Sequence, residues 1–206
     1  MNPDIVPTAY VVDDDESIRE LWRWLLESKG IAVRIFASAG AFIESYRRGD
    51  PGCLVLDVRM PRMSGPELQD HLRREAIDLP IVFISAYGDV PTAVKALKLG
   101  AVDFIQKPFD YRAAVATVLR ALERDAQERQ VRARRKDLAG RLAALTVRER
   151  EVMALVIEGK PNKVIAEALD ISIRTVEFHR ANVMEKMGAT SVATLVQLVA
   201  LYGVPA

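Results

Sequence analysis

Four short apolar runs in this chain of 206 residues are each followed by side chains that could do chemistry. Asp13 and Asp14 follow the first run, Asp57 the second, Ser85 the third and Lys107 the fourth. Because the carboxyl ends of parallel strands meet at one edge of a sheet, these side chains would converge on one pocket. Three clustered carboxylates repel one another, and the simplest relief is a divalent cation bound by oxygens, for which Mg²⁺ with several retained waters fits best.

Such a pocket would hold what a phosphoryl group requires. A metal-bound aspartate is a nucleophile toward phosphorus, and Asp57 is the best candidate because it stands alone at the end of a central run. The Lys107 ammonium would pair with one phosphoryl oxygen, and the Ser85 hydroxyl would donate to another. Asp13 and Asp14 are adjacent, which suits them to holding the metal. The sequence therefore predicts phosphoryl transfer to Asp57.

The elements that position these residues are predicted from the apolar pattern. The four runs are short and continuously apolar, as in buried parallel strands; they lie at residues 10–12, 54–56, 81–84 and 104–105. A fifth run at residues 32–36 alternates and is typical of an edge strand. Helical patterns lie between the runs, and Ser64 with Glu67 forms a capping box for one of them. Five strands alternating with five helices predict a doubly wound α/β fold over residues 1–120.

The motifs at the ends of these runs resemble those of the bacterial response-regulator receiver domain over about residues 5–120. They read VVDDD, VLDVRMPRMSG, VFISAYGDVP and AVDFIQKPF. The resemblance implies that Asp57 accepts phosphate from a sensor histidine kinase. It also implies that Asp14 and the Arg59 backbone carbonyl join Asp57 on Mg²⁺, while Asp13 acts through water.

The same resemblance implies a switch that follows phosphorylation. Ser85 would follow the phosphoryl group, and the aromatic side chain of Phe104 would then turn inward. Lys107 would precede a cis peptide bond to Pro108, which proline makes tolerable. Many members of the family carry threonine where this chain has Ser85, and serine lacks the methyl group. We therefore expect a switch that is less sharply two-state.

Other interpretations of the acidic residues stay open. An aspartate run such as residues 13–15 is often only a solvated helix start, where negative charge suits the helix dipole. A phosphatase with an aspartyl nucleophile would carry a second aspartate two positions on, where this chain has Arg59. A regulator that binds DNA constitutively, with a receiver that is not phosphorylated, is the third alternative.

Residues 142–206 predict a second, all-α domain of four helices. Thr146 and Glu149 form a capping box before an apolar stripe. A short helix over about residues 162–169 is followed by a turn and by Ser172, which is suited to cap a longer helix that ends before Gly188. Two helices joined by a tight turn indicate a helix-turn-helix.

A rotation of about 100° per residue divides the longer helix into faces. Its buried stripe would consist of Val176, Val183 and Met187. The opposite face carries Arg174, Glu177, Phe178, Ala181 and Glu185, and the flanks carry Thr175, His179, Arg180 and Asn182. In a major groove the flanks would reach phosphates while the centre reads base edges. Phe178 would then touch a thymine methyl group, although exposed aromatic side chains also occur singly without a function.

This segment resembles the tetrahelical DNA-binding domain of the NarL/LuxR class, through LTVREREVMALVIEGKPNKVIAEALDIS and RTVEFHRANVMEKMGATS. Together with the receiver, the chain resembles FixJ-type two-domain regulators. The resemblance implies promoter DNA and RNA polymerase as partners. It assigns two sets of DNA contacts: Lys163, Thr175, Arg180 and Asn182 to phosphates, and Arg174, Glu177, Phe178 and Ala181 to bases. Some members of the class carry other residues at the positions of Glu177 and Phe178. The base sequence that those members prefer therefore does not transfer to this chain.

The segment between the domains, residues 121–141, predicts a helical linker that continues the last receiver helix, because it is rich in alanine, arginine and glutamate. The apolar stripe expected on the continuous helix, which begins at Tyr111, consists of Val115, Val118, Leu119, Leu122 and Ala126. Basic residues follow: Arg124, Arg129, Arg132, Arg134, Arg135 and Lys136. They indicate either a solvated basic helix or a segment that contacts a coiled-coil partner or DNA phosphates.

The resemblance also implies a dimer. In related regulators the helix that here contains Val90, Val94 and Lys98 forms the dimer face with the neighbouring strand. Phosphorylation would promote dimerisation through this face. An isologous dimer would place two recognition helices on a palindromic site.

Composition agrees with one medium and one small domain. By charged side chains, residues 1–120 have a net charge of −2 and residues 121–206 of +3, so the DNA-facing half is mildly basic. Cys53 is the only cysteine, which excludes an intramolecular disulfide and suits a reducing cytoplasm. No stretch is long enough to span a membrane. We expect a cytoplasmic regulator whose receiver assists only its own phosphotransfer and autodephosphorylation.

Overall fold

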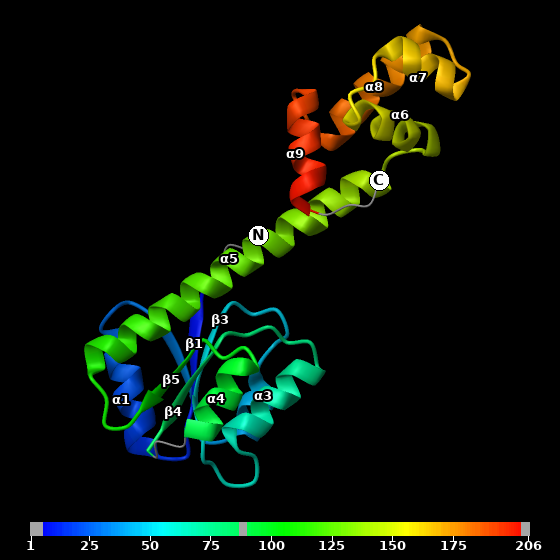
Figure 1. The fold of residues 1–206 in the computed structure, drawn as a ribbon. Helices are drawn as coiled ribbons and strands as arrows, with labels where there is room; N and C mark the ends of the chain where they lie inside the picture. Colours follow the sequence, from blue (N-terminus) through cyan, green and yellow to red (C-terminus); the bar gives the residue numbers. More distant parts are fainter. Residues whose placement is uncertain (1–5, 87–89, 203–206) are drawn as a thin grey trace. The chain divides into compact units, whose positions relative to one another are not determined.

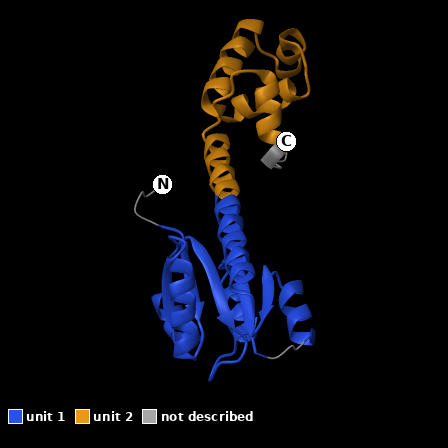
Figure 2. Ribbon diagram, turned by 90° about the vertical axis from the view of Figure 1, so that its left-hand side faces the viewer, with its two compact units in different colours: residues 1–129 blue, residues 130–206 orange. Residues whose placement is uncertain are grey.

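The computed structural model describes residues 6–86 and 90–202. The chain divides into two compact units, Met1–Arg129 and Gln130–Ala206, which Figure 2 shows in blue and orange. The first unit is α/β and the second consists of helices (Figure 1). Residues 87–89 of the third motif, and residues 1–5 and 203–206 of the expected domains, lie outside the described residues.

The first unit is built on a five-stranded parallel sheet in the order β2-β1-β3-β4-β5. The strands are β1 (Thr8–Val12), β2 (Ala32–Phe36), β3 (Gly52–Asp57), β4 (Ile81–Ser85) and β5 (Asp103–Gln106). The expected doubly wound fold is therefore confirmed, and β2 lies at an edge as its alternation predicted. β3 and β4 are buried along their whole length, because helices cover both faces of a parallel sheet.

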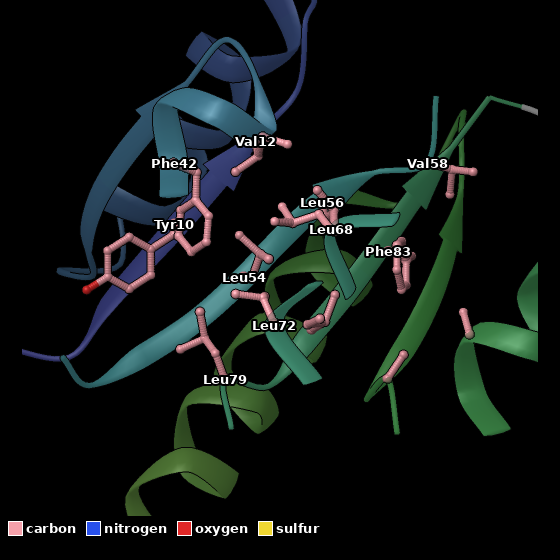
Figure 3. Packing of buried hydrophobic residues seen from close by; sticks show 14 of the residues in the cluster. Tyr10, Val12, Phe42, Leu54, Leu56, Val58, Leu68, Leu72, Leu79 and Phe83 are labelled. Carbon is pink, nitrogen blue, oxygen red and sulfur yellow. The ribbon is translucent and has the colours of Figure 1, made fainter. Parts of the chain in front are cut away.

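Helices pack on both faces of this sheet. They are α1 (Glu16–Glu27), α2 (Ala39–Ser45), α3 (Gly65–Arg74), α4 (Val90–Lys98) and α5 (Tyr111–Ala143). One core cluster joins α2, α3 and α4 to side chains such as Leu54 and Leu56 of β3, which Figure 3 shows beside Leu68 of α3. The second core cluster joins α1 and α5 to the alternate strand residues, including Val11 and Val55. The Ser64 and Glu67 capping box is present at the start of α3.

Cys53 of β3 lies in the second cluster. It is fully buried, and its Sγ lies 3.9 Å from the backbone carbonyl oxygen of Val118 in α5. Burial raises the pKa of this thiol far above its ordinary value, and the nearby Asp125 carboxylate raises it further. A thiol in this environment stays protonated and unreactive.

The second unit holds the four expected helices: α6 (Val147–Ile157), α7 (Asn162–Leu169), α8 (Ile173–Met187) and α9 (Val192–Tyr202). Val176, Val183 and Met187 of α8 are buried, as the rotation predicted. They pack in one cluster with side chains of α6, α7 and α9 and with Leu138 near the end of α5. Among the described residues, no helix is both long and apolar enough to span a membrane.

Helix α5 is a single helix of 33 residues, which confirms that the last receiver helix continues into the linker. The predicted apolar stripe was wrong at two positions. Leu119 is 39% exposed and Ala126 is also exposed, whereas Asp125 is only 1% exposed. The helix instead faces the sheet through small and β-branched residues, namely Ala114, Val115, Val118 and Ala121. The buried Asp125 follows one turn later, beside the backbone N–H of Gly52 at the start of β3.

Asp125 and Arg129 attach α5 to the loop before β3, and we call this pair the α5 anchor. The Asp125 carboxylate accepts hydrogen bonds from the Gly52 N–H at 2.9 Å and from Arg129 Nε at 2.6 Å. Arg129 also donates to the carbonyl oxygens of Gly49 at 2.6 Å and of Asp50. At Gly52, a Cβ atom would lie 2.0 Å from the Thr8 carbonyl oxygen, so only glycine fits. The anchor therefore pairs Oδ2 of the buried Asp125 carboxylate and three backbone groups, whereas Asp125 Oδ1 is buried without a hydrogen-bond partner among the described residues.

Replacing Arg129 by methionine should destabilise the first unit by about 1.5–3 kcal/mol, because the buried Asp125 carboxylate would lose its cation. Urea unfolding followed by tryptophan fluorescence measures this loss, since the two tryptophans of the chain, Trp22 and Trp24, lie in α1. Arg124→Met is the matched control: Arg124 pairs with Glu128 at the surface of the same helix. This control should change stability by less than about 0.5 kcal/mol. Equal losses in both variants would contradict the role of the anchor.

Candidate functional site

The register of the sheet brings the strand ends to one edge. β1 pairs Val12 with Leu56 of β3, so the next residues, Asp13 and Asp57, are neighbours. β3 pairs Asp57 with Ile84 of β4, and Ser85 follows directly. β4 pairs Ser85 with Gln106 of β5, which Lys107 follows. The reactive residues predicted from separate parts of the sequence therefore share one edge.

Lys107 bridges two carboxylates at this edge. Its Nζ lies 2.9 Å from Asp13 Oδ2 and 2.9 Å from Asp57 Oδ1. Asp13 is 2% exposed and Asp57 7% exposed. The backbone N–H of Asp15 donates to Asp13 Oδ1 at 2.9 Å, and that of Arg59 donates to Asp57 Oδ2 at 2.7 Å. Each oxygen of both carboxylates therefore has a hydrogen-bond donor.

The electrostatics of these groups follow from burial and from the bridge. Burial raises the pKa of Asp13 above its ordinary value, although the hydrogen bonds from Lys107 and Asp15 oppose this shift. Burial also lowers the pKa of Lys107, but its hydrogen bonds to Asp13 and Asp57 outweigh burial, and the net pKa is raised. Lys107 is thus held in its cationic form between the two carboxylates, where it can interact with an anionic group.

The backbone around Asp57 is held by neighbouring elements. The Val58 N–H donates to the Ile84 carbonyl at 3.0 Å, and the Gly65 N–H at the start of α3 donates to the Val58 carbonyl at 3.0 Å. A Cβ atom on Gly65 would lie 2.4 Å from the Asp57 carbonyl oxygen. The close approach of α3 to Asp57 therefore requires glycine at this position.

Ser85 ends β4, Lys107 directly follows β5, and Phe104 lies within β5. The Lys107 N–H donates to the Ser85 carbonyl at 2.7 Å, and Ser85 is 3% exposed. The Lys107–Pro108 peptide bond is cis, as the resemblance implied. The Phe104 ring is partly buried, with its centroid 6.3 Å from that of Phe83. Phe104 thus packs on the cluster that also contains α4.

Asp14 is not brought into the bridge. It is exposed, and no described group donates a hydrogen bond to its carboxylate. Across the described part of the chain, no three acidic, histidine or cysteine side chains gather within reach of one metal ion. The predicted cluster of three carboxylates is therefore incomplete, because Lys107 lies between the buried pair while Asp14 is exposed away from it.

The residues at this edge nevertheless fit Mg²⁺. This cation prefers oxygen ligands, keeps several waters and needs only one or two protein carboxylates. Asp57 and Asp13 supply buried carboxylate oxygens, and the Arg59 backbone lies beside them, with its N–H 2.7 Å from Asp57 Oδ2. Two carboxylates and one ammonium leave a net negative charge, which suits a divalent cation.

The predicted recognition helix α8 presents its polar faces as the rotation indicated. The residues proposed to read bases, Arg174, Glu177, Phe178 and Ala181, are all exposed, and the Phe178 side chain is 63% exposed. The flanking Thr175, Arg180 and Asn182 are partly buried, and Lys163 is exposed on α7. Ser172 caps the helix through the Thr175 N–H. Arg180 Nη1 donates to Asn162 Oδ1 at 2.9 Å, which connects α8 to the start of α7.

An ion pair between a buried carboxylate and an exposed lysine connects α6 to α8 in the same unit. Glu149 is 3% exposed and belongs to the predicted capping box with Thr146. Lys186 Nζ lies 2.6 Å from Glu149 Oε2 and also donates to the Ala144 carbonyl at 3.3 Å. The hydrogen bond from Lys186, followed by that from the Thr146 N–H, lowers the pKa of Glu149 from 4.5 to about 2. The sequence indicated the cap but not Lys186, which lies 37 residues away.

Helix α4 exposes an apolar surface. Val90 is 68% exposed, Val94 43% and Leu97 44%, and Lys98 is also exposed. The dimer face predicted from the sequence did not include Leu97, although Leu97 lies one helical turn after Val94. Val90, Val94 and Leu97 are spaced four and three residues apart, so these exposed aliphatic side chains share one face of the helix.

A parallel α/β unit with a bridged pair of aspartates, followed by a helix-turn-helix unit, defines a regulator with an input domain and a DNA-binding domain. Two family models match: the response regulator receiver domain over residues 9–119, and the luxR family of bacterial regulatory proteins over residues 143–199. The chain belongs to the response regulators with a LuxR-type DNA-binding domain, which are two-component transcriptional regulators rather than classical enzymes.

Similar proteins extend over nearly the whole chain. The transcriptional regulatory protein FixJ of Azorhizobium caulinodans is 45% identical over 202 residues, which cover 98% of this chain and 95% of that protein. The C4-dicarboxylate transport transcriptional regulatory protein DctR of Rhodobacter capsulatus is 44% identical over 93% of this chain and 98% of its own length. The solved structure of the response regulator StyR has a TM-score of 0.89 and 46% identity, covering 96% of this chain and 100% of that chain.

These findings confirm the FixJ-type resemblance and the two-domain fold. A receiver domain implies a kinase as partner, and a LuxR-type domain implies binding to DNA. Receiver domains generally bind Mg²⁺ at their acidic pocket. The pocket of this chain has the residue types for both the cation and a phosphoryl group.

Acid should weaken the second unit through Glu149. Its pKa in the folded protein lies below the ordinary 4.5, so its stabilising effect is complete above that pH and is lost as pH falls from 4.5 toward 2. Glu149→Gln should remove this part of the pH dependence. The measurement is thermal unfolding by circular dichroism across this range, with tryptophan fluorescence used to subtract the first unit, which contains Trp22 and Trp24.

Glu151→Gln is the matched control for Glu149→Gln. Glu151 lies on the same helix and pairs at the surface with Arg148 at 2.9 Å. This variant should keep the pH dependence of the unsubstituted protein. A Glu149→Gln variant that loses stability between pH 4.5 and 2 as steeply as the unsubstituted protein would exclude the assigned role of Glu149.

Proposed function

We propose that a sensor histidine kinase phosphorylates this regulator on Asp57, and that phosphorylation promotes its dimerisation and its binding to promoter DNA. The observation that carries the proposal is the Lys107 bridge. Its ammonium lies 2.9 Å from an oxygen of both Asp13 and Asp57, at the edge where Ser85 also ends its strand. Nucleophile, cation and hydroxyl are the groups that phosphoryl transfer to an aspartate requires.

In the proposed reaction an oxygen of Asp57 forms a bond to the phosphorus of the kinase phosphohistidine. The phosphorus–nitrogen bond breaks, and the histidine leaves with its electron pair. Lys107 moves from its bridge to pair with one phosphoryl oxygen, and the Ser85 hydroxyl donates to another. Asp14, Asp57 and the Arg59 carbonyl would hold Mg²⁺, with Asp13 acting through water, and the bound cation would neutralise charge on the phosphoryl oxygens.

The phosphoryl group would change the surface near α4 through Ser85 and Phe104. Ser85 moves toward the new phosphoryl oxygens, and Phe104 follows into the space that it leaves. Phe104 already packs partly buried against Phe83, so a short inward rotation is compatible with the core. The rotation alters the packing under α4, whose Val90, Val94 and Lys98 form the proposed dimer face.

Dimerisation would pair two recognition helices on one operator. An isologous contact through α4 gives the dimer a twofold axis, and a twofold axis matches a palindromic DNA site. In each subunit of the dimer, the phosphates are contacted by Lys163, Thr175, Arg180 and Asn182. The bases are faced by Arg174, Glu177, Phe178 and Ala181. The bound dimer acts on transcription through RNA polymerase. A protein that binds the chromosome acts in the cytoplasm, which is the proposed location.

Phosphorylation should convert the protein from monomer to dimer. The test is sedimentation with Mg²⁺ before and after a small phosphoryl donor such as acetyl phosphate is added, with mass spectrometry to confirm the modified residue. Asp57→Asn should take up no phosphate and stay monomeric. Val94→Arg should be phosphorylated on Asp57 yet stay monomeric, because a charge would be buried in the apolar face.

Two results would contradict this proposal. Absence of phosphate on Asp57 would favour a regulator that binds DNA constitutively, and Asp57→Asn would then leave DNA affinity unchanged. Phosphorylated Val94→Arg that dimerises fully would show that α4 is not the dimer face.

The DNA contacts predict two different kinds of defect. Lys163→Ala should weaken binding about equally for all sequences and reduce the slope of log affinity against log salt by about one, because it removes a phosphate contact. Arg174→Ala should cost about 1–3 kcal/mol on the preferred operator and relax its base preference at one position. Fluorescence anisotropy on a selected operator and on a scrambled duplex measures both effects.

Lys160→Ala is the control for the DNA measurements. Lys160 is exposed in the turn between α6 and α7, where it lies 3.9 Å from Glu158. Its replacement should leave affinity and salt slope nearly unchanged. A salt slope that Lys163→Ala does not alter would remove Lys163 from the phosphate-binding set.

A further inference from the structure

Arg19 of α1 bonds the backbone of the acidic loop that follows β1. Its Nη1 donates to the carbonyl oxygen of Asp13 at 2.8 Å and to that of Asp14 at 2.9 Å. The Arg19 N–H also donates to the Asp15 carbonyl at 3.1 Å as α1 begins. The side chain is half-buried, and one guanidinium nitrogen thus bonds two successive carbonyl groups. None of the steps in the proposed phosphotransfer uses this guanidinium.

The loop that Arg19 holds carries two of the three aspartates of the pocket. The Asp13 carboxylate is already fixed on both oxygens by Lys107 and by the Asp15 N–H. The Asp14 carboxylate is exposed and accepts no hydrogen bond from the described residues. Its direction therefore depends on the loop backbone, and Arg19 holds that backbone through its carbonyl groups.

We propose that Arg19 is a positioning residue for the divalent cation. By holding the Asp13 and Asp14 carbonyls, it keeps the Asp14 carboxylate directed at the cation beside Asp57. The inference rests on the proposed function, because that function assigns Asp14 and Asp57 to one Mg²⁺. Groups that orient metal ligands without touching the metal change metal affinity by about 10–100-fold when they are removed.

The charge of Arg19 and its hydrogen bonds act in opposite directions on the cation. A guanidinium stays protonated, so its charge repels Mg²⁺ at short range. If charge were its only effect, replacing Arg19 by a neutral residue would tighten Mg²⁺ binding. If Arg19 positions the loop, the same replacement weakens binding. The sign of the change in affinity therefore separates the two roles.

The test is calorimetric titration of the metal-free full-length protein with magnesium chloride. Arg19→Met, which removes both the charge and the donors, should weaken Mg²⁺ binding by about tenfold or more. Arg19→Lys keeps the charge and can donate to one carbonyl, so its affinity should lie between those of Arg19→Met and the unsubstituted protein. Hydrogen exchange in metal-free protein should show faster exchange of the amides of residues 14–17 in Arg19→Met.

Arg23→Met is the matched control. Arg23 lies one turn later on α1 and pairs at the surface with Glu20 at 3.2 Å, so its replacement removes the same charge without touching the loop. It should leave Mg²⁺ affinity and loop exchange unchanged. Arg19→Met or Arg19→Lys with unchanged or tighter Mg²⁺ binding overturns the positioning role while leaving the proposed function intact. Unsubstituted protein that binds no Mg²⁺ overturns the proposed cation site and this inference with it.

Discussion

The bridge from Lys107 to Asp13 and Asp57 is the interaction on which the receiver pocket depends. Two buried carboxylates beside each other are unstable in a protein interior unless a cation lies between them. The sheet brings Asp13 and Asp57 together through the pairing of Val12 with Leu56, and β5 delivers Lys107 to the same edge. The register of three different strand pairs is therefore needed to balance one cluster of charges.

The surroundings of the bridge are constrained to match it. Gly65 lets α3 pack closely against Asp57, because a Cβ atom at this position would lie 2.4 Å from the Asp57 carbonyl oxygen. The backbone N–H groups of Asp15 and Arg59 occupy the remaining carboxylate oxygens. Backbone N–H groups therefore fix one oxygen of each carboxylate, and Lys107 fixes the other.

The two units treat charge in opposite ways. The first unit buries carboxylates at the sheet edge and at the α5 anchor, and each is matched by a basic side chain. In the described part of the second unit, the buried Glu149 carboxylate pairs with the exposed Lys186, and the polar faces of α8 are exposed. Buried charge specifies the geometry of the receiver, whereas exposed charge in the second unit serves binding to a polyanion.

The sequence predicted the features that depend on local pattern. Strand ends, the capping boxes at Ser64 and Thr146 and the buried stripe of α8 follow from periodicity and short spacings, and the structure confirms them. It did not predict the bonds of Arg19 to carbonyl groups, the α5 anchor or the Lys186 partner of Glu149. These contacts join side chains to backbone groups or to residues far away in the sequence, so no pattern of residue spacing indicates them. Leu119 and Ala126 were misplaced because a buried Asp125 replaces an apolar residue in the stripe.

The buried thiol of Cys53 has a practical consequence for spectroscopy. Maleimide and nitroxide reagents attack exposed thiolates, and this thiol is both enclosed and protonated. If one cysteine were introduced on the surface of each unit, such reagents would modify these two cysteines alone, and Cys53 would not need to be replaced. Paired labels would then report the separation of the receiver and the recognition helix, before and after phosphorylation, in an otherwise unaltered core.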